Sequence, residues 1–229
     1  MVYNKPKEAR FMEHILREVH SPLFSGIQPQ ELDAMLGCIG YHIGNYKKGE
    51  IIAFEAENIR HVGVILTGAV DMVKEDLWGN RTMLMRMRKD ELFGETFVCG
   101  AVNTSVVTFS VSEDAQILFL PFDRVMNSCT NTCVFHHQLI ENMVRVIAMK
   151  NLELMRKVEV VSKKNLREKI LAYLSLQAQL HESRYFEIPL GRIELADYLC
   201  ADRSALTREL SKMRDEGLID YDKNMFRVF

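Results

Sequence analysis

The spacing of apolar residues divides the first half of the chain into two regions. From residue 1 to about residue 36, apolar side chains recur every three or four positions, which predicts short helices. From Gly40 to Phe122, short runs rich in Val, Ile, Phe and Thr alternate with turn signals, a pattern typical of a β-sandwich or barrel. The helical groups are Phe11, Ile15, Val19 and Leu32, Met35, Leu36, and the predicted strands are 61–67, 69–74, 82–88, 104–111 and 116–122.

A helical period returns at about Asn131 and continues without Gly or Pro for some thirty residues. Its main stripe alternates steps of four and three, as in the a/d seam of a coiled coil, and predicts a dimer interface. The alternative is a helix simply buried in its own domain. A polar residue within such a seam can fix register. The stripe comprises Ile140, Val144, Ile147, Asn151, Leu154, Val158 and Val161; a second set, Met143, Leu152 and Met155, predicts another buried flank.

A compact helical segment follows the long helix. Leu166 to Leu180 is amphipathic, and Pro189 and Gly191 then interrupt the chain. The stretch from Arg192 to Leu199 predicts one helix, Cys200 and Ala201 a short turn, and Asp202 the cap of a second helix, its carboxylate accepting from exposed backbone N–H groups. Two strands, 218–221 and 226–229, then predict a hairpin.

The second of these helices has two chemically distinct faces. Leu206, Leu210 and Met213 share the core side, with Ala205 beside them. The other side carries small polar residues and arginines, which can enter a DNA major groove. The sequence suggests no role for Glu209. An amphipathic helix with an ordinary solvated face is the alternative. The predicted DNA-binding residues are Arg203, Ser204, Thr207, Arg208 and Ser211, with Arg192 from the preceding helix.

Composition limits the possible locations of the protein. The 229 residues are 48% hydrophobic and 26% charged, as in soluble globular proteins, and the polar start MVYNKPKEAR does not resemble a signal peptide. We therefore expect a cytoplasmic protein with no membrane partner.

The five cysteines are odd in number and predict free thiols. The net charge is -2, so any DNA-binding charge must be local to one face.

Several motifs resemble the catabolite-activator and fumarate-nitrate-regulator (Crp/Fnr) family. They include Lys48-Gly-Glu-Ile-Ile, Leu92-Phe-Gly-Glu, Asp202-Arg-Ser-Ala-Leu-Thr-Arg-Glu-Leu and Glu216-Gly-Leu-Ile, in family order over nearly the whole chain. The resemblance implies an α+β architecture: a double-stranded β-helix (jelly-roll) sensor domain of the cyclic-nucleotide-binding type over 1–130, a dimerisation helix over 131–162 and a winged helix-turn-helix over 163–229.

The resemblance also implies roles for individual residues. The family's recognition-helix arginines correspond to Arg203 and Arg208. Ser204 replaces a base-reading Glu that is common in the family, which removes an acceptor for cytosine N4 and argues against the usual half-site. Gly191 stands where a capping Ser or Thr is common.

The sensor region retains only half of the family's cyclic-nucleotide cassette. Gly94 and Glu95 are present, but the segment Asn103-Thr-Ser-Val holds no Arg to neutralise a phosphate. Arg81, Arg86 and Arg88 belong to another strand. The sequence therefore argues against cyclic AMP and leaves the effector unknown; a metabolite pocket would involve Gly94, Glu95, Thr104, Ser105 and Asn151, and a retained structural turn is the alternative.

Metal, haem and redox sensing remain alternatives. Cys129, Cys133 and His136 recur at helical spacing, with His137 adjacent, and thiolate and imidazole groups can hold a metal or haem. Buried thiols and surface histidines are the simpler interpretation. The resemblance argues against iron–sulfur sensing, because the oxygen-sensing relatives have several cysteines grouped near the N-terminus, whereas the first cysteine here is Cys38. Nothing in the sequence lowers the expected pKa of a thiol such as Cys99.

The sequence thus predicts a homodimeric regulator that binds a near-palindromic double-stranded DNA site, and RNA polymerase if it activates. A signalling module that uses the winged helix to contact a protein partner is the second hypothesis. We expect no enzyme, because no Ser-His-Asp, P-loop or HExxH pattern occurs.

Overall fold

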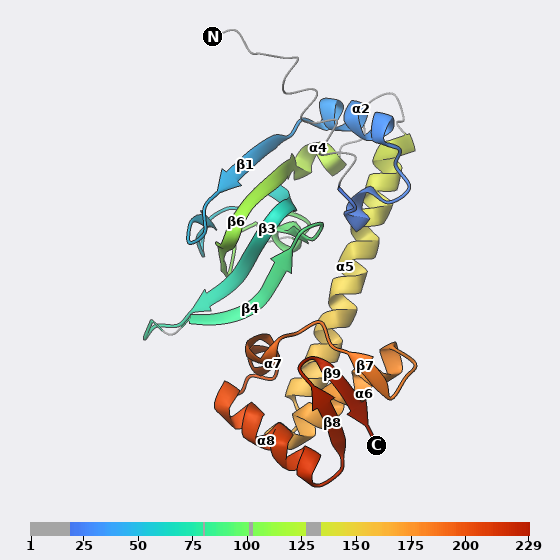
Figure 1. Cartoon of the computed structure of the whole chain (residues 1–229). Helices are drawn as coiled ribbons and strands as arrows, with labels where there is room; N and C mark the ends of the chain where they lie inside the picture. The colour runs from blue at the N-terminus through green and yellow to red at the C-terminus, as the bar shows by residue number, and fades with distance from the viewer. Residues whose placement is uncertain (1–18, 80, 101–102, 127–133) are drawn as a thin grey trace. The chain divides into compact units, whose positions relative to one another are not determined.

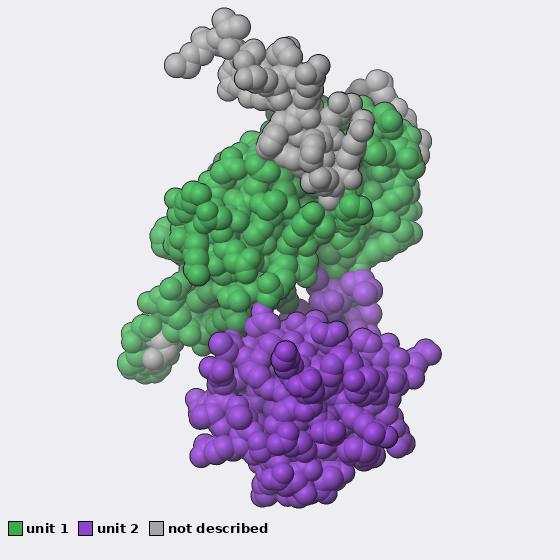
Figure 2. All heavy atoms as spheres, viewed as in Figure 1, with its two compact units in different colours: residues 1–148 green, residues 149–229 purple. Residues whose placement is uncertain are grey.

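A computed structural model describes residues 19–79, 81–100, 103–126 and 134–229. The chain divides into two compact units, residues 1–148 and 149–229 (Figure 2). The division falls within the longest helix, α5 (Val134–Val161). The three-part division at residues 130 and 162 stays a prediction. No helix among the described residues is long and apolar enough to cross a membrane.

Unit 1 is built on one antiparallel sheet of six strands. The principal order is β1-β6-β3-β4, with β2 paired to β6 and β5 to β3 (Figure 1). A hairpin joins β3 to β4, and its tip exposes Leu77 and Trp78, with 98% and 83% of their surfaces accessible. The strands are β1 (His42–Tyr46), β2 (Ile51–Ala53), β3 (His61–Glu75), β4 (Arg81–Arg88), β5 (Leu92–Phe93) and β6 (Thr108–Pro121).

The prediction of separate short strands was wrong at two places. Strands 61–67 and 69–74 are one strand, β3, and the region 104–122 holds one strand, β6, preceded by a loop. The turn signal at Gly68 is a bulge: its φ is +81°, and a Cβ there would lie 2.2 Å from the Asp114 carbonyl oxygen. Glycine permits this close approach, so the chain bends without reversing.

Short helices cover one part of the sheet. Leu32, Met35 and Leu36 are buried in α2, as the apolar spacing predicts; Phe11 and Ile15 lie outside the described residues. Asn142 of α5 is buried and donates to the carbonyl oxygens of Leu23 and Ser25, at 3.0 and 2.7 Å. These bonds fasten the start of α5 to the N-terminal segment. The helices are η1 (Pro22–Phe24), α2 (Pro29–Ile39), α3 (Glu95–Val98) and α4 (Phe122–Met126).

Unit 2 is a winged helix. Three helices pack on a small antiparallel sheet of order β7-β9-β8 (Figure 1). Leu206, Leu210 and Met213 are fully buried, which confirms the predicted core face of the second helix. The elements are α6 (Leu166–Leu180), β7 (Tyr185–Glu187), α7 (Arg192–Tyr198), α8 (Arg203–Asp215), β8 (Ile219–Asp222) and β9 (Met225–Val228).

Candidate nucleic-acid interface and sensor site

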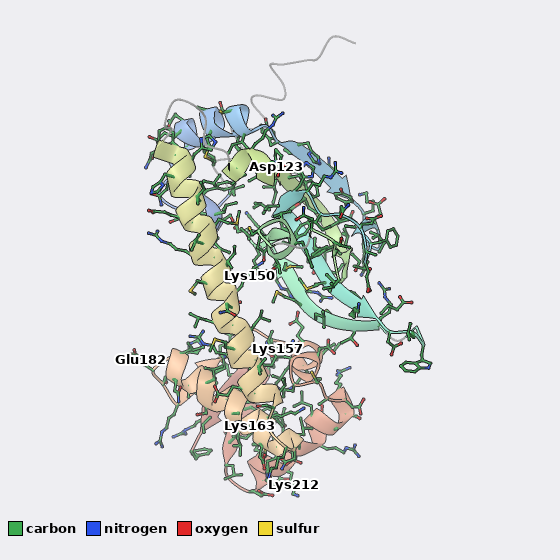
Figure 3. All side chains as sticks on the ribbon, turned by 180° about the vertical axis from the view of Figure 1, so that it is seen from behind. Asp123, Lys150, Lys157, Lys163, Glu182 and Lys212 are labelled. Atoms are coloured by element: carbon green, nitrogen blue, oxygen red, sulfur yellow. The ribbon has the colours of Figure 1, made fainter. Side chains whose placement is uncertain are left out.

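A four-residue turn, residues 199–202, joins α7 to α8. Cys200 occupies it with φ +50°, a left-handed conformation usually given to glycine, and its N–H donates to the Asp197 carbonyl at 3.1 Å. The Lys169 ammonium of α6 donates to the Leu199 carbonyl at 3.2 Å. Behind the turn, the Lys157 ammonium lies 5.4 Å from the Tyr198 ring (Figure 3). The helix-turn-helix is therefore supported from both α5 and α6.

The ends of these helices are capped differently from the sequence-based expectation. Asp202 is the N-cap residue of α8, but its carboxylate makes no capping hydrogen bond, so that detail of the prediction was wrong. Its side chain is exposed, and water can replace the carboxylate as acceptor for the backbone N–H groups of the first turn. At α7 the N-cap is Gly191, and its N–H donates to the Glu194 carboxylate at 3.0 Å. Glu194 thus supplies one half of a capping box, and the half that a Ser or Thr hydroxyl would supply is absent at Gly191.

The polar face of α8 is open to solvent over its first two turns. Arg203, Ser204, Thr207 and Arg208 are exposed, whereas Ser211 is half-buried. The Thr207 hydroxyl donates to the Arg203 carbonyl at 2.9 Å, which leaves its lone pairs outward. The exposed part of this face carries two cations and two hydroxyls, the groups that bind base edges and phosphates.

Glu209 has a structural role that the sequence interpretation missed. Its carboxylate lies 3.2 Å from Nε of Arg167 on α6, and the same guanidinium also pairs with Glu216. Glu209 and Glu216 are seven residues apart and so face the same way from the end of α8. That spacing was the feature of the sequence from which a shared partner for the two carboxylates could have been predicted. The three charges fix α8 against α6 on the side away from the polar face.

Arg192 is engaged within the winged helix. Its guanidinium lies 4.7 Å from the Tyr221 ring and 5.1 Å from the Phe226 ring, and Nη2 donates to the Lys223 carbonyl at 2.8 Å. Burial lowers the pKa of this guanidinium from its ordinary value. Its predicted DNA contact remains a prediction, competing with these internal contacts.

The Gly94-Glu95 pair forms a tight turn at the start of α3. Gly94 has φ +84°, and a Cβ there would lie 2.9 Å from the His61 carbonyl, so glycine is required by the backbone itself. Glu95 is buried, with 4% of its surface accessible, and Thr96 Oγ1 lies 3.4 Å from its carboxylate. The backbone geometry favours the structural interpretation of this pair.

The loop that corresponds to the second half of the cassette is held by hydrogen bonds to its own backbone and to neighbouring side chains. Ser105 is buried and its hydroxyl donates to the Val107 carbonyl at 2.7 Å, while Thr104 Oγ1 lies 3.3 Å from Asn58 Oδ1. Lys74 donates to the Val106 carbonyl at 3.1 Å and pairs with Glu55. The loop is therefore stabilised by internal hydrogen bonds.

The three candidate arginines on β4 are paired with carboxylates. Arg86 makes a bidentate contact with Asp71 at 2.7 and 2.9 Å. Arg81 lies 4.0 Å from Glu75, and Arg88 lies 3.9 Å from Glu113. A phosphate would have to compete with these carboxylates, most of all for Arg86.

A small hollow adjoins α3. Its volume is about 170 Å³, and it is lined by Ile59, Arg60, Val98, Asn103 and Asp123. Ligand pockets for drug-sized molecules occupy about 300–1,000 Å³. This hollow is too small to enclose a nucleotide. Asn151 is exposed and belongs to the other compact unit, so its place in an effector pocket stays a prediction.

The proposed metal ligands are only partly described. Cys129 and Cys133 lie outside the described residues. His136 is buried, whereas His137 is exposed and its Nε2 lies 3.3 Å from the Glu141 carboxylate. Among the residues that the structure describes, no three His, Cys, Asp or Glu side chains are grouped to hold a metal ion.

Cys99 should be a slow nucleophile. Cys99 reaches the surface, but partial desolvation of its thiol, helped by the Glu95 carboxylate, raises the pKa of that thiol to about 11. At neutral pH the thiolate fraction should be about 100-fold below that of an unshifted thiol, and it should rise up to about pH 11. Peptide mapping after iodoacetamide labelling from pH 7 to 11 measures this. Labelling of Cys99 at pH 7.5 as fast as that of free cysteine would contradict the assignment.

The predicted dimer seam on α5 is substantially exposed in the single chain. Val144, Leu154 and Val158 expose 61%, 49% and 62% of their surfaces, and Asn151 is also exposed. Ile140, Ile147 and Val161 are partly buried. The second apolar set does not form the expected buried flank: Met143 is buried, but Leu152 and Met155 expose 46% and 61%. The described contacts of unit 2 leave that part of the helix uncovered.

Comparison with known proteins matches both halves of the chain. A cyclic nucleotide-binding domain model matches residues 43–131, and a Crp-like helix-turn-helix domain model matches residues 168–228. The chain is 24% identical over 199 residues to the cyclic AMP receptor protein of Thermus thermophilus, covering 87% of this chain and 88% of that relative.

Solved structures share the fold. The c-di-GMP responsive global regulator CLP of Xanthomonas campestris is 15% identical, with a TM-score of 0.62 over 86% of this chain and 97% of that one. FixK2 of Bradyrhizobium japonicum is 16% identical, with a TM-score of 0.56 over 82% and 92%. A cyclic-nucleotide-binding type β-domain is thus followed by a long helix and a Crp-like helix-turn-helix, and the chain belongs to the Crp/Fnr family of transcription regulators.

Proposed function

We propose that the protein is a homodimeric regulator that reads a near-palindromic DNA site through the exposed face of α8. One observation carries the proposal: four side chains capable of contacting DNA, Arg203, Ser204, Thr207 and Arg208, share the exposed side of a helix whose opposite side is fully buried. The chain from residue 162 onward holds 12 Lys and Arg against 11 Asp and Glu, so the attraction to DNA must come from cations grouped on this face rather than from net charge.

The dimer follows from the surface of α5. Apolar side chains covering this much of a helix are costly in water, and a heptad seam on a second copy would cover them. Two copies joined this way would present two reading helices, about 34 Å apart if they enter successive major grooves. Asn151 in the seam would favour one register. We propose the seam residues named above as this interface.

A salt titration separates this function from that of a signalling module that contacts a protein. The probe is a short duplex selected by the wild-type protein from a random pool. Contacts to phosphates should make log affinity fall steeply with log salt, with a slope of about -0.9 for each phosphate neutralised. A flat slope, or no preference for the selected duplex over an unrelated one, would favour the signalling module. Arg81→Ala, on the β3–β4 hairpin, is a matched control that should leave the slope unchanged.

The effector, in our proposal, is something other than cyclic AMP. The carboxylates bound to Arg81, Arg86 and Arg88 support this, as does the loop closed by Lys74 and Ser105. The relatives differ in this respect by name, since one is a cyclic AMP receptor and another is c-di-GMP responsive. The same titration with saturating cyclic AMP provides the check. A rise in affinity for the selected duplex would restore cyclic AMP as the effector.

A further inference from the structure

Tyr221 stands at the meeting point of the wing and both helices of the helix-turn-helix. On β8 it pairs with Phe226, which pairs in turn with Phe186 of β7, so these three rings share the inner face of the small sheet. The Tyr221 and Phe226 rings are 5.6 Å apart. Tyr185, by contrast, is opposite Arg227 and belongs to the outer face.

Two arginines from different helices lie over the Tyr221 ring. The guanidinium of Arg192, from α7, is 4.7 Å from its centroid, and that of Arg214, from α8, is 5.0 Å away. Arginine within about 6 Å of an aromatic ring is attracted to its face. Arg192 also donates to the Lys223 carbonyl at the turn of the wing, 2.8 Å away. One ring therefore connects β8, α7 and α8.

The hydroxyl of Tyr221 adds a contact to the reading helix itself. It lies 3.5 Å from the Ser211 hydroxyl, at the outer limit of hydrogen-bond distance, and either hydroxyl can donate. Ser211 is half-buried, unlike the four exposed residues of the polar face. A serine hydroxyl directed at the wing is not directed at base edges. This explains the difference between Ser211 and its neighbours on α8.

We propose that Tyr221 is a positioning residue for sequence reading, and that Ser211 is its hydrogen-bonding partner rather than a DNA contact. From α6, Arg167 holds α8 by its ion pair with Glu209. From the wing, Tyr221 holds the same helix through Arg214 and Ser211. Functional side chains must be held within about 0.5 Å and 10–20° of their productive geometry. Tyr221 would supply part of that constraint for Arg203 and Arg208. The inference rests on the proposed DNA-binding function.

A double-mutant cycle in the full-length protein tests the inference. The variants Tyr221→Phe, Ser211→Ala and the double variant are titrated with the selected duplex and with an unrelated duplex of equal length. Loss of one hydrogen bond should lower affinity for the selected duplex by about 2- to 10-fold in either single variant. The double variant should be no worse than either single one, because both remove the same contact. Affinity for the unrelated duplex should stay unchanged.

Removing the ring should have a larger effect on specificity. Tyr221→Leu removes the ring that Arg192 and Arg214 share, and the ratio of affinities for the selected and unrelated duplexes should fall by about 10-fold. Tyr221→Phe should lower that ratio by less than Tyr221→Leu does, since it loses the hydrogen bond but keeps the stacked ring. Tyr185→Leu is the matched control, a tyrosine on the outer face of the same sheet, and should leave the ratio unchanged.

Three results would overturn the inference. A loss in Ser211→Ala that Tyr221→Phe does not share, or additive losses in the double variant, would make Ser211 a direct DNA contact. An equal fall in affinity for both duplexes in Tyr221→Phe would give Tyr221 a merely structural role, and this test holds even if Tyr221→Leu fails to fold. Wild-type protein that shows no preference for any duplex would instead overturn the proposed function itself.

Discussion

Replacing Arg203 and Arg208 together by alanine should lower affinity for the selected duplex by about 2–6 kcal/mol, with about 1–3 kcal/mol from each. Both guanidinium groups are exposed on the open side of α8, and Arg is the side chain best suited to bidentate binding of guanine O6 and N7. An alanine there leaves the edge of the base without its hydrogen bonds to the protein. Fluorescence anisotropy at fixed salt measures the loss, which amounts to about 30-fold or more.

The size of the two single losses carries additional information. An arginine that reads a base should lose specificity at one position of the site, whereas an arginine on a phosphate should weaken binding to all duplexes alike. Arg81→Ala controls for the removal of one exposed charge from the same chain. If the double variant bound the selected duplex as tightly as the wild-type protein, α8 would not be the reading helix.

Replacing Leu154 and Val158 together by aspartate should convert the proposed dimer to monomers. Both side chains are about half or more exposed in the single chain, at 49% and 62%, and both belong to the heptad stripe. Burying four carboxylates across a two-fold seam is strongly unfavourable without partners. We expect the dissociation constant of the dimer to rise by at least about 100-fold, which corresponds to about 3 kcal/mol. Analytical ultracentrifugation over a concentration series measures it.

Operator binding should weaken along with the dimer, since a monomer engages one half-site instead of two. Leu180→Asp is the matched control: Leu180 is 51% exposed on α6, outside the seam. That variant should sediment and bind DNA like the wild-type protein. A double aspartate variant that remained dimeric would place the interface elsewhere on the chain.

The sequence predicted those elements whose signal is local. The helix at Leu166–Leu180 and the two faces of α8 were predictable because apolar periodicity and burial coincide there. β3 was not predicted as a single long strand, because a bulge at Gly68 looks in sequence like a turn. Whether a glycine bends or reverses a chain depends on the partner strand, which sequence spacing does not reveal.

The candidate site shows the same limit at single residues. Arg203 and Arg208 could be placed from angular position alone. Arg192 and Ser211 have polar side chains at suitable positions, yet their structural partners, Tyr221 and Lys223, come from a hairpin ten or more residues away. Glu209 likewise pairs with Arg167 from a helix far earlier in the chain. Such long-range pairs decide which polar residues remain available for DNA.

The exposed tip of the β3–β4 hairpin has a practical consequence. Trp78 is the only tryptophan in the chain, its side chain is almost fully in water, and its backbone N–H donates to the Asp76 carboxylate at 2.9 Å. Tryptophan emission therefore reports on this hairpin alone: it should already be red-shifted in the native protein and open to iodide quenching. Unfolding of the variants above must therefore be followed by circular dichroism. A partner that covers the hairpin should shift the tryptophan emission to shorter wavelength.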